Sequence, residues 1–303
     1  MRVSHLIPLY KSARFHDVIV ANIEALVDPR DEIILSDRNG DKDYCKRLLR
    51  MFANRANVRV LLSDDNANWV ENIAGLISAA QGRFLRILPH DDSIDKAGVE
   101  ALVAVLMQDP GAAVAFGQTI AIGLDGQRIA DRDELNLAEG SSTSRWVLED
   151  ILPMFWTGRF PGSFKGLVRS ALAKQNALRF RATPGLMHSE RAWLFALGLA
   201  GAFRYVPAVV LTKRYYPEST HRSWVKSPKA FTDVADLMTD YAKALLPSGE
   251  LIEYASRDLA LNAANAVAAL RPQAARFRYQ PAPDAKAEAL RSHPLPGHMW
   301  GKM

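Results

Sequence analysis

The sequence predicts an α/β fold, with a mostly parallel central sheet flanked by helices and a C-terminal helical appendage. Short β-rich runs alternate with helical patterns over the first 117 residues, which is typical of βαβ units. Beyond Lys226 the chain is rich in Ala and Leu at helical spacing, which indicates the appendage. With 303 residues, 49% apolar and 23% charged, the composition is that of a globular protein.

Five short apolar runs predict the strands of the sheet. They are bounded by turn-forming or polar residues, as strands usually are. The expected strands are Val3–Leu9, Glu32–Ser36, Val58–Leu62, Phe84–Leu88 and Ala113–Gly117. After the fifth run, the pair Asp125-Gly126 is a turn signal and predicts a β-hairpin.

Helical patterns lie between the later strands. One ends just before Gly82, a plausible terminator, and the next ends at Asp109 and Pro110. The periodic apolar positions are Val70, Ile73, Ala74 and Ile77 in the first pattern, and Val99, Leu102, Val103 and Leu106 in the second.

From about residue 131 the regular alternation fails. Residues 131–144 are polar and serine-rich and predict a loop, and a helix is expected near residues 189–200 with Trp193 facing the core. Residues 203–216 predict a further strand. The last 30 or so residues contain five prolines and predict an irregular tail.

Charge and cysteine content narrow the functional classes. The net charge of +5 is spread along the chain and suits an anionic ligand, but no basic block with interleaved aromatics predicts a nucleic-acid partner. Cys45 is the single cysteine, so the sequence has no disulfide framework and no CxxC metal site. Neither a signal peptide nor a membrane-spanning run of about 18 to 20 apolar residues is present. The expected location is the cytoplasm, which leaves room for peripheral association with the inner face of the membrane.

Polar residues follow four of the expected strands, at residues 8–10, 37–40, 64–68 and 90–92. In open parallel sheets, ligands bind beyond the carboxyl ends of the strands. Asp91 and Asp92 are neighbours there, and their repulsion disfavours double ionisation unless a cation offsets it. Mg²⁺ or Mn²⁺ would do so and would take phosphate oxygens as well. The simpler alternative is that Asp92 or Ser93 only caps the helix that begins near Asp95; the position after the βαβ series favours a ligand site.

The two common phosphate-binding loops are missing from the sequence. The first strand is followed by LIPLYKSARF, which contains no GxGxxG motif, and no GxxxxGK[ST] occurs elsewhere. A metal ion is therefore expected to do more of the phosphate binding. Carboxylates of a glycosidase pair lie on different elements, about 5 to 9 Å apart, so adjacent Asp91 and Asp92 do not fit that chemistry.

The ordered set VSHLIPLY, DEIILSDRNGD and ENIAGLISAAQGRFLRILPHDD resembles the family 2 glycosyltransferases of GT-A fold. The resemblance covers roughly residues 2–125, extends more weakly to about residue 224, and suggests the bacterial surface-glycan type. It implies a glycosyltransferase domain at 1–225, with a nucleotide-sugar-binding half at 1–125 and an acceptor-binding half at 126–225. Residues 226–303 are left for the helical appendage and the irregular tail.

The resemblance also implies roles for individual residues. The metal, Mn²⁺ or Mg²⁺, would be held by Asp91 and Asp92, with Asp92 as the principal ligand. In the family this metal bridges the diphosphate and stabilises the charge of the departing group. The implied nucleotide-sugar-binding residues are Pro8, Leu9, Tyr10, Asp37, Asn39, Asn72, His90 and Asp91.

The segment MHSERAWLFALGLAGAFRYVP resembles the family's acidic motif beneath the acceptor site, which makes Glu190 the implied catalytic base. The alternative is structural: with Ser189 as N-cap, Glu190 would be favoured in the first helical turn by the helix dipole alone. The implied acceptor-binding residues are His188, Arg191 and Trp224.

The chain departs from the family pattern at several positions. Arg38 stands where many members have a second acidic residue, and Glu71 where many have Arg. Pro89 replaces an Asp two positions before the acidic pair. Tyr216 stands where a His often supplies a further metal ligand, and His221 is a candidate substitute five residues on.

The predicted function is metal-dependent, inverting transfer of a sugar from a nucleotide-sugar donor to a hydroxyl of a glycan or lipid-linked acceptor. Two alternatives stay open at the level of sequence. A nucleotidyltransferase also places metal carboxylates at strand ends, and a catalytically degenerate nucleotide-sugar-binding module would keep the fold without the chemistry. The C-terminal helices further suggest a homo-oligomer.

Overall fold

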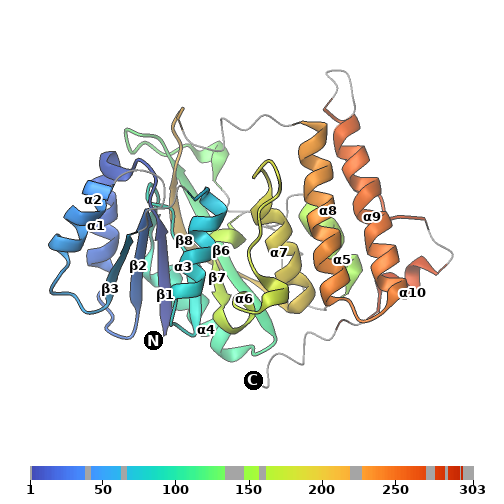
Figure 1. Ribbon diagram of the computed structural model, residues 1–303, viewed down its shortest axis with the longest axis horizontal. Coiled ribbons are helices and arrows are strands. Elements are labelled where there is room, and N and C mark those ends of the chain that lie inside the picture. Colours follow the sequence, from blue (N-terminus) through green and yellow to red (C-terminus); the bar gives the residue numbers. More distant parts are fainter. Residues whose placement is uncertain are drawn as a thin grey trace.

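A computed structural model describes residues 2–37, 42–62, 67–133, 147–156, 162–218, 227–270, 277–283, 286–293 and 295. At its centre lies an eight-stranded sheet with the strand order β3-β2-β1-β4-β7-β6-β8-β5 (Figure 1). The strands are β1 (Val3–Pro8), β2 (Glu32–Asp37), β3 (Val58–Leu62), β4 (Phe84–Ile87), β5 (Ser93–Ile94), β6 (Ala112–Ile122), β7 (Leu167–Arg169) and β8 (Ala202–Arg214).

The sheet is mixed. Strands β3, β2, β1 and β4 are parallel, and the short β7 runs antiparallel between β4 and β6. Strand β8 is parallel to β6, so it runs in the same direction as β4, and β5 pairs with it antiparallel. The first four strands are found where the sequence predicts them. Strands β7 and β5 escape prediction because runs of three and two residues are too short to show a period.

Helices cover both faces of the sheet. They are α1 (His16–Ala25), α2 (Lys42–Met51), α3 (Trp69–Ala79), α4 (Lys96–Gln108), α5 (Leu148–Trp156), α6 (Ser170–Ala173), α7 (Ser189–Ala200), α8 (Pro228–Leu245), α9 (Gly249–Ala268) and α10 (Ala287–Arg291). The described residues also form short 3-10 helices, which are η1 (Ser12–Phe15), η2 (Ala130–Arg132), η3 (Ser163–Lys165) and η4 (Asn176–Leu178).

Helix α4 begins with a cap of its own. The carboxylate of Asp95 accepts a 2.7 Å hydrogen bond from the Gly98 N–H, as an N-cap residue does. The alternative in which Asp92 or Ser93 caps this helix is therefore wrong. Asp92 is left for another role.

The alternation of side chains along the strands builds two hydrophobic layers. Leu6 and Ile34 face one cluster, which contains α3, α5, α7, α8 and α9. Ile7 and Ile33, the neighbours in sequence, face the other cluster, which contains α1, α2 and α4. Successive residues of a strand point to opposite faces, so a strand that is covered on both faces buries residues at every position. The result is a three-layer α/β/α arrangement.

The predicted β-hairpin after the fifth strand is only partly formed. Gly126 has a φ of 78°, the left-handed conformation that a tight turn needs and glycine adopts freely. The Gly123 N–H donates to the Gln127 carbonyl at 2.9 Å, and a single bridge joins Ile122 to Arg128. The turn is confirmed, but no second strand of the hairpin follows it in the described residues.

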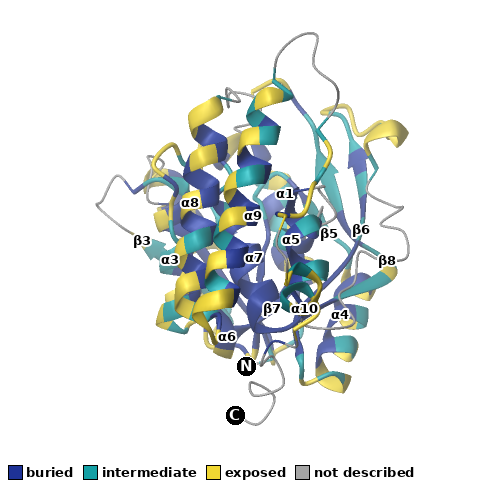
Figure 2. Ribbon diagram, turned by 90° about the vertical axis from the view of Figure 1, so that its right-hand side faces the viewer, coloured by how far each residue is buried: buried dark blue, intermediate teal, exposed yellow. Residues whose placement is uncertain are grey.

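Helices α8 and α9 confirm the helical nature of the C-terminal region. Each buries one face and exposes the other (Figure 2), and their buried side chains belong to the same cluster as Leu6 of the sheet. Beyond α9 the chain is held by Asp258, which accepts hydrogen bonds from the Tyr279 hydroxyl at 2.8 Å and the Ala282 N–H at 3.0 Å. The short α10 interrupts the tail expected to be irregular. The boundaries at residues 125 and 225 stay predictions.

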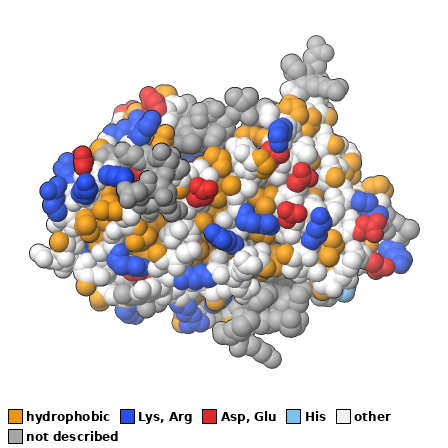
Figure 3. All heavy atoms as spheres, viewed as in Figure 1, with side chains coloured by type: hydrophobic (Ala, Val, Ile, Leu, Met, Phe, Trp, Pro, Cys, Tyr) orange, Lys and Arg blue, Asp and Glu red, His pale blue; other side chains and the backbone are white. Residues whose placement is uncertain are grey.

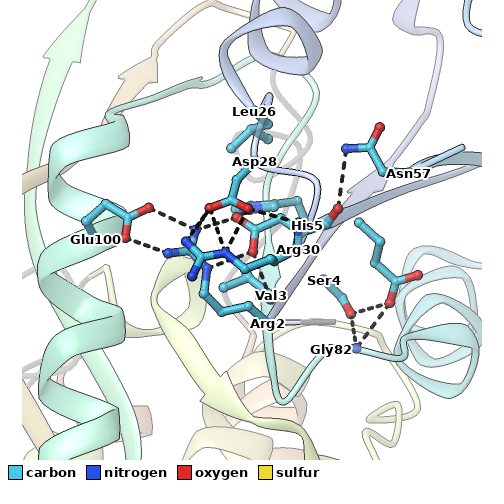
Figure 4. Close-up of polar contacts among 12 residues, drawn as sticks. Arg2, Val3, Ser4, His5, Leu26, Asp28, Arg30, Asn57, Gly82 and Glu100 are labelled. Atoms are coloured by element: carbon cyan, nitrogen blue, oxygen red, sulfur yellow. Dashed lines mark hydrogen bonds and ion pairs between the residues drawn. The ribbon is translucent and has the colours of Figure 1, made fainter. Parts of the chain in front are cut away.

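Ion pairs close the amino edge of the sheet (Figure 4). Arg2 donates to the carboxylate of Asp31 at 2.6 Å and to that of Glu100 at 2.6 Å. Beside them, the Ser4 hydroxyl donates to Glu32 at 2.6 Å and accepts from the Gly82 N–H at 2.8 Å. These polar groups satisfy one another, so this edge is occupied by structural contacts.

Candidate active site

The carboxyl edge of the sheet brings together the ends of β1, β2 and β4. The Leu9 N–H donates to the Ser36 carbonyl at 2.8 Å, and the Leu88 N–H donates to the Leu6 carbonyl at 2.8 Å. These bonds extend the pairing just past the strand ends. The segments predicted to carry nucleotide-binding residues, 8–10, 37 and 90–92, therefore lie on adjacent strands.

The predicted nucleotide-binding residues differ in exposure. Tyr10 is 41% exposed and open to a ligand, whereas the Leu9 side chain is 1% exposed and packs in the core. The Leu9 side chain is therefore not accessible to a ligand, and the place of Leu9 in the nucleotide pocket stays a prediction. Asp37 is also buried, at the end of β2. Asn39, Trp224 and the substitute ligand His221 lie outside the described residues.

Asn72 has a supporting contact. It is buried on α3, and its amide nitrogen donates to the Ser36 carbonyl at 3.1 Å. This bond fixes α3 against the end of β2, next to Asp37. The amide oxygen of Asn72 is buried and accepts no hydrogen bond from the described residues.

His90 joins the loops that follow β4 and β1. Its Nδ1–H donates to the Pro8 carbonyl at 3.1 Å, since a carbonyl can only accept. Its ring packs against Phe15 with centroids 5.4 Å apart. His90 thereby positions the acidic pair relative to the segment after β1.

Asp91 lies beside an aromatic and cationic cluster. The Tyr216 hydroxyl donates to Asp91 Oδ2 at 2.8 Å. The Tyr216 ring packs against Phe15 at 5.3 Å, and the Arg14 guanidinium lies over that ring at 4.7 Å. Burial, with the Asp91 charge as the next cause, raises the pKa of Tyr216 above its usual range, so the hydroxyl keeps its proton and stays a donor. Asp91 Oδ1 accepts no hydrogen bond from a described residue, and the side chain is partly exposed.

Asp92 is buried and fully engaged. Lys165 Nζ donates to Oδ2 at 2.6 Å, and the Arg214 backbone N–H donates to Oδ1 at 2.9 Å. Asn22 additionally donates to the Asp92 carbonyl at 2.8 Å. Burial raises the pKa of the Asp92 carboxyl, and the attraction of Lys165 opposes the rise. A cation bound by Asp92 would have to displace the Lys165 ammonium, so these contacts do not favour the expected role of principal metal ligand.

Glu190 lies in the first turn of α7. Since α7 leads into β8 at the amino edge and runs back along the sheet (Figure 1), its first turn lies toward the carboxyl edge. Glu190 Oε2 is buried and has no hydrogen-bond partner among the described residues. Burial raises the pKa of this carboxyl above its usual range. A buried carboxyl of raised pKa, with one oxygen that receives no hydrogen bond, is a group suited to accepting a proton.

The alternative in which Ser189 caps α7 is not what the structure shows. His188 occupies the cap position with a φ of 62°, and the Ser189 hydroxyl donates to the Leu186 carbonyl at 2.9 Å. Of the predicted acceptor-binding residues, the His188 ring packs 5.6 Å from Phe231 and the Arg191 guanidinium lies 5.8 Å from a Trp156 ring. Both therefore flank Glu190 in packed surroundings.

Three residues of this site escaped prediction. Lys165 and Arg214 contact Asp92, and Arg14 lies over Tyr216. They follow no motif, because their place is set by tertiary contacts between segments far apart in sequence. Among the residues that the structure describes, no three His, Cys, Asp or Glu side chains group as metal ligands. None of the described helices combines the length and apolarity needed to cross a bilayer.

Comparison with known proteins agrees with this geometry. A family model described as "Glycosyl transferase family 2" matches residues 4–174, more than half of the chain. A comparison with curated protein sequences finds no match.

Solved structures of S. aureus TarS 1-349 share the fold. The TM-score is 0.65 for the complex with UDP-GlcNAc and 0.63 for the complex with UDP. Each likeness has 15% sequence identity and covers 89% of this chain and 74% of that chain. The predicted α/β fold of GT-A type is thus confirmed. Together with the family match, it shows that the chain belongs to glycosyl transferase family 2 and is a glycosyltransferase.

Proposed function

We propose that the protein transfers a sugar from a nucleotide-sugar donor to an acceptor hydroxyl, with inversion at the sugar carbon and with a divalent metal. The main observation behind this proposal is the position of Asp91, which follows β4, is partly exposed and is hydrogen-bonded to Tyr216. The carboxyl edge of a parallel sheet is where nucleotide ligands bind. The similar TarS fragment has been crystallised with UDP-GlcNAc and with UDP, which supports a nucleotide-sugar donor.

Asp91 fits a divalent metal better than Asp92 does. Its Oδ1 is left without a hydrogen bond from the described residues, whereas both oxygens of Asp92 are bound. Mg²⁺ in nucleotide enzymes is held by one or two carboxylates, with substrate phosphates and waters completing the shell. A metal held by Asp91 would offset the charge that develops on the departing diphosphate. The assignment of Mn²⁺ or Mg²⁺ is part of the proposal.

Asp92 acts through the loop that carries Asp91. Its carboxylate is bound by Lys165, just before β7, and by the backbone of Arg214, at the end of β8. These two hydrogen bonds fix the loop and therefore the neighbouring Asp91. A ligand-binding carboxylate needs such rigid support, because small displacements weaken an electrostatic contact. The remaining donor contacts are proposed for Pro8, Tyr10, Asp37 and Asn39.

Glu190 is the proposed base. Inverting transfer requires a group that takes the proton of the acceptor hydroxyl as it attacks the sugar carbon on the face opposite the nucleotide. The unpaired Oε2 and the raised pKa of Glu190 suit this task. The acceptor would lie beside the head of α7, near His188 and Arg191.

The acceptor is proposed to be a glycan or a lipid-linked glycan, as in polysaccharide biosynthesis on a bacterial surface. The corresponding place of action is the cytoplasm, with peripheral association at the inner face of the membrane. Self-association through the exposed faces of α8 and α9 belongs to the same proposal.

One experiment tests the function. A panel of nucleotide sugars, including UDP-GlcNAc, is titrated with and without Mn²⁺ while thermal stabilisation and nucleotide release are followed. A bound donor stabilises the fold, because it binds only the native state. We expect at least one donor to stabilise the protein in a metal-dependent way. We also expect the nucleotide of that donor to be released when a glycan acceptor is added. Binding without release in every case would instead indicate a degenerate binding module.

A further inference from the structure

A groove on one face of the molecule is not used by the donor site. It runs along α3, opposite the segment 173–182 that leads from α6 toward α7. Its upper part, which includes Ala67 and Ala182, has a volume of about 560 Å³. Its lower part, which includes Ala173 and Lys174, has a volume of about 440 Å³. Ala74, Ser78, Arg179 and Phe180 line both parts, so the groove is continuous along the helix.

The two walls of the groove differ in chemistry. The α3 wall includes small residues that let a ligand approach the helix closely, namely Ala74, Gly75 and Ser78 on α3 and Ala67 just before it. The opposite wall carries three basic residues. These are Lys174, Arg179 and Arg181.

Of these three basic residues, Arg179 is the one whose charged group is least engaged by other described residues. It is exposed, and the structure pairs its guanidinium with no described carboxylate. Arg181 lies 3.9 Å from Asp240 and over the Tyr241 ring at 4.2 Å, which holds it in place while leaving its charge only weakly offset. In Figure 3, Lys and Arg side chains lie across the middle of this face, with Asp and Glu side chains among them. The groove therefore favours a negatively charged ligand.

Glu71 is the one acidic residue among those that line the groove. Its carboxylate accepts a 3.0 Å hydrogen bond from the Asn68 N–H, while the Asn68 side chain accepts from the N–H groups of Val70 and Glu71. This capping box uses the carboxylate for the start of α3. Glu71 keeps its negative charge, but the three basic residues of the opposite wall outnumber it.

The groove leads to the proposed base. Ala182 lines its upper end and precedes Thr183, whose N–H donates to the Ser189 hydroxyl at 3.0 Å. Glu190 follows Ser189 at the head of α7. At the lower end, Lys174 donates to the Ala80 carbonyl just beyond α3. The α3 residues that line the groove run from Val70 to Ser78, and its upper end lies near the head of α7, which carries Glu190.

We propose that this groove binds the acceptor, and that the acceptor is a glycan chain carrying phosphate or carboxylate groups. The inference rests on the proposed function, because it places the chain so that its end reaches Glu190. Arg179 and Arg181 contact its anionic groups, since guanidinium matches both phosphate and carboxylate. The small residues of α3 accommodate the sugar backbone.

The test measures binding without catalysis. Polygalacturonate supplies a carboxylated chain, linear polyphosphate a phosphorylated one, and dextran a neutral one; each is titrated against the full-length protein at low and moderate salt. Arg179→Glu reverses the charge of one wall, and Ser78→Glu adds a negative charge to the exposed face of the other. Arg50→Glu on α2, outside the groove, is the matched control.

We expect at least one charged chain to bind, with salt-dependent affinity, and dextran not to bind. Arg179→Glu and Ser78→Glu should weaken that binding at least tenfold, while Arg50→Glu changes it less than twofold. The affinity for UDP should be unchanged in all three variants. Comparing the two anionic probes shows whether phosphate or carboxylate is preferred.

Equal losses in the groove and control variants would overturn the inference and indicate attraction by overall charge. Tighter binding of a single-stranded RNA of matched charge through Arg179 would also overturn it, in favour of a nucleic-acid site. If the wild-type protein binds UDP but no charged chain, the groove assignment fails while the proposed function stands. If it binds no charged chain and no donor of the nucleotide-sugar panel, both fail.

Discussion

The Tyr216 hydroxyl donates to Asp91 Oδ2 at 2.8 Å, across 125 residues of sequence. The bond joins the segment after β8 to the loop after β4. It places an aromatic ring where many family members are expected to carry a metal-binding His. The acidic loop is thus held from one side by a protonated phenol and from another by His90.

Tyr216→Phe should weaken UDP binding by roughly three- to tenfold, because Asp91 loses a hydrogen bond worth about 1 kcal/mol that fixes its carboxylate. Tyr216→His should instead raise the affinity for Mn²⁺ by adding an imidazole ligand. Calorimetric titration of UDP and of Mn²⁺ measures both. Unchanged affinities in both variants would remove Tyr216 from the donor site.

Asp91 and Asp92 should respond differently to substitution. Asp91→Asn should abolish metal-dependent UDP binding and leave the melting temperature nearly unchanged. Asp92→Asn leaves the largely buried Lys165 ammonium without its carboxylate, which should cost about 3 kcal/mol of unfolding free energy. Denaturant unfolding and UDP titration of the two variants separate these effects. A stable Asp92→Asn protein that has lost only its metal response would restore Asp92 as the principal ligand.

Glu190→Gln should retain UDP binding and lower kcat by two to four orders of magnitude, since the amide cannot accept the proton. A base must be ionised, and burial raises the pKa of Glu190 above its ordinary 4.5. The rate of the wild-type enzyme should therefore fall as the pH drops through that raised value, before an exposed glutamate would titrate. A pH profile of kcat measures this, and transfer that survives in Glu190→Gln would place the base elsewhere.

Asp258 should make stability depend on pH. Burial raises its pKa from 3.8 to about 6, so between these values the folded protein binds more protons than the unfolded chain. The unfolding free energy should fall by roughly 2 kcal/mol between pH 4.5 and pH 7.5, which covers most of this window. Asp258→Asn should flatten this dependence, as denaturant unfolding at pH 4.5 and pH 7.5 would measure. If the unfolding free energy fell with pH by the same amount in the wild-type protein and in Asp258→Asn, Asp258 would not be the group responsible.

Much of the fold can be predicted from the sequence because its signals are local. The strands that hold Leu6, Ile34 and Leu85 are buried on both faces, so they are short, largely apolar runs, and the helical spacing in α3 and α4 is equally plain. Trp193 is found in the core, as its helical position predicts. The three-residue β7 carries no such signal, and its place between β4 and β6 is set by tertiary pairing.

The candidate site is less predictable for the same reason. Sequence places Asp91 and Asp92 at a strand end, but not which of them is engaged by other groups. That difference comes from Lys165, 73 residues away, and from a backbone N–H of Arg214, 122 residues away. A backbone donor leaves no trace in the residue type that supplies it.

The short antiparallel β7 has a consequence for how the enzyme can be divided. Lys165 lies two residues before β7, and Arg214 lies at the end of β8. Both residues lie beyond residue 125, yet together they hold Asp92. A fragment ending at residue 125 would contain both aspartates and lack the groups that fix their loop. The predicted nucleotide-binding half, residues 1–125, is therefore not expected to work as a transplantable module, because the groups that fix its acidic loop come from the part of the chain that follows it.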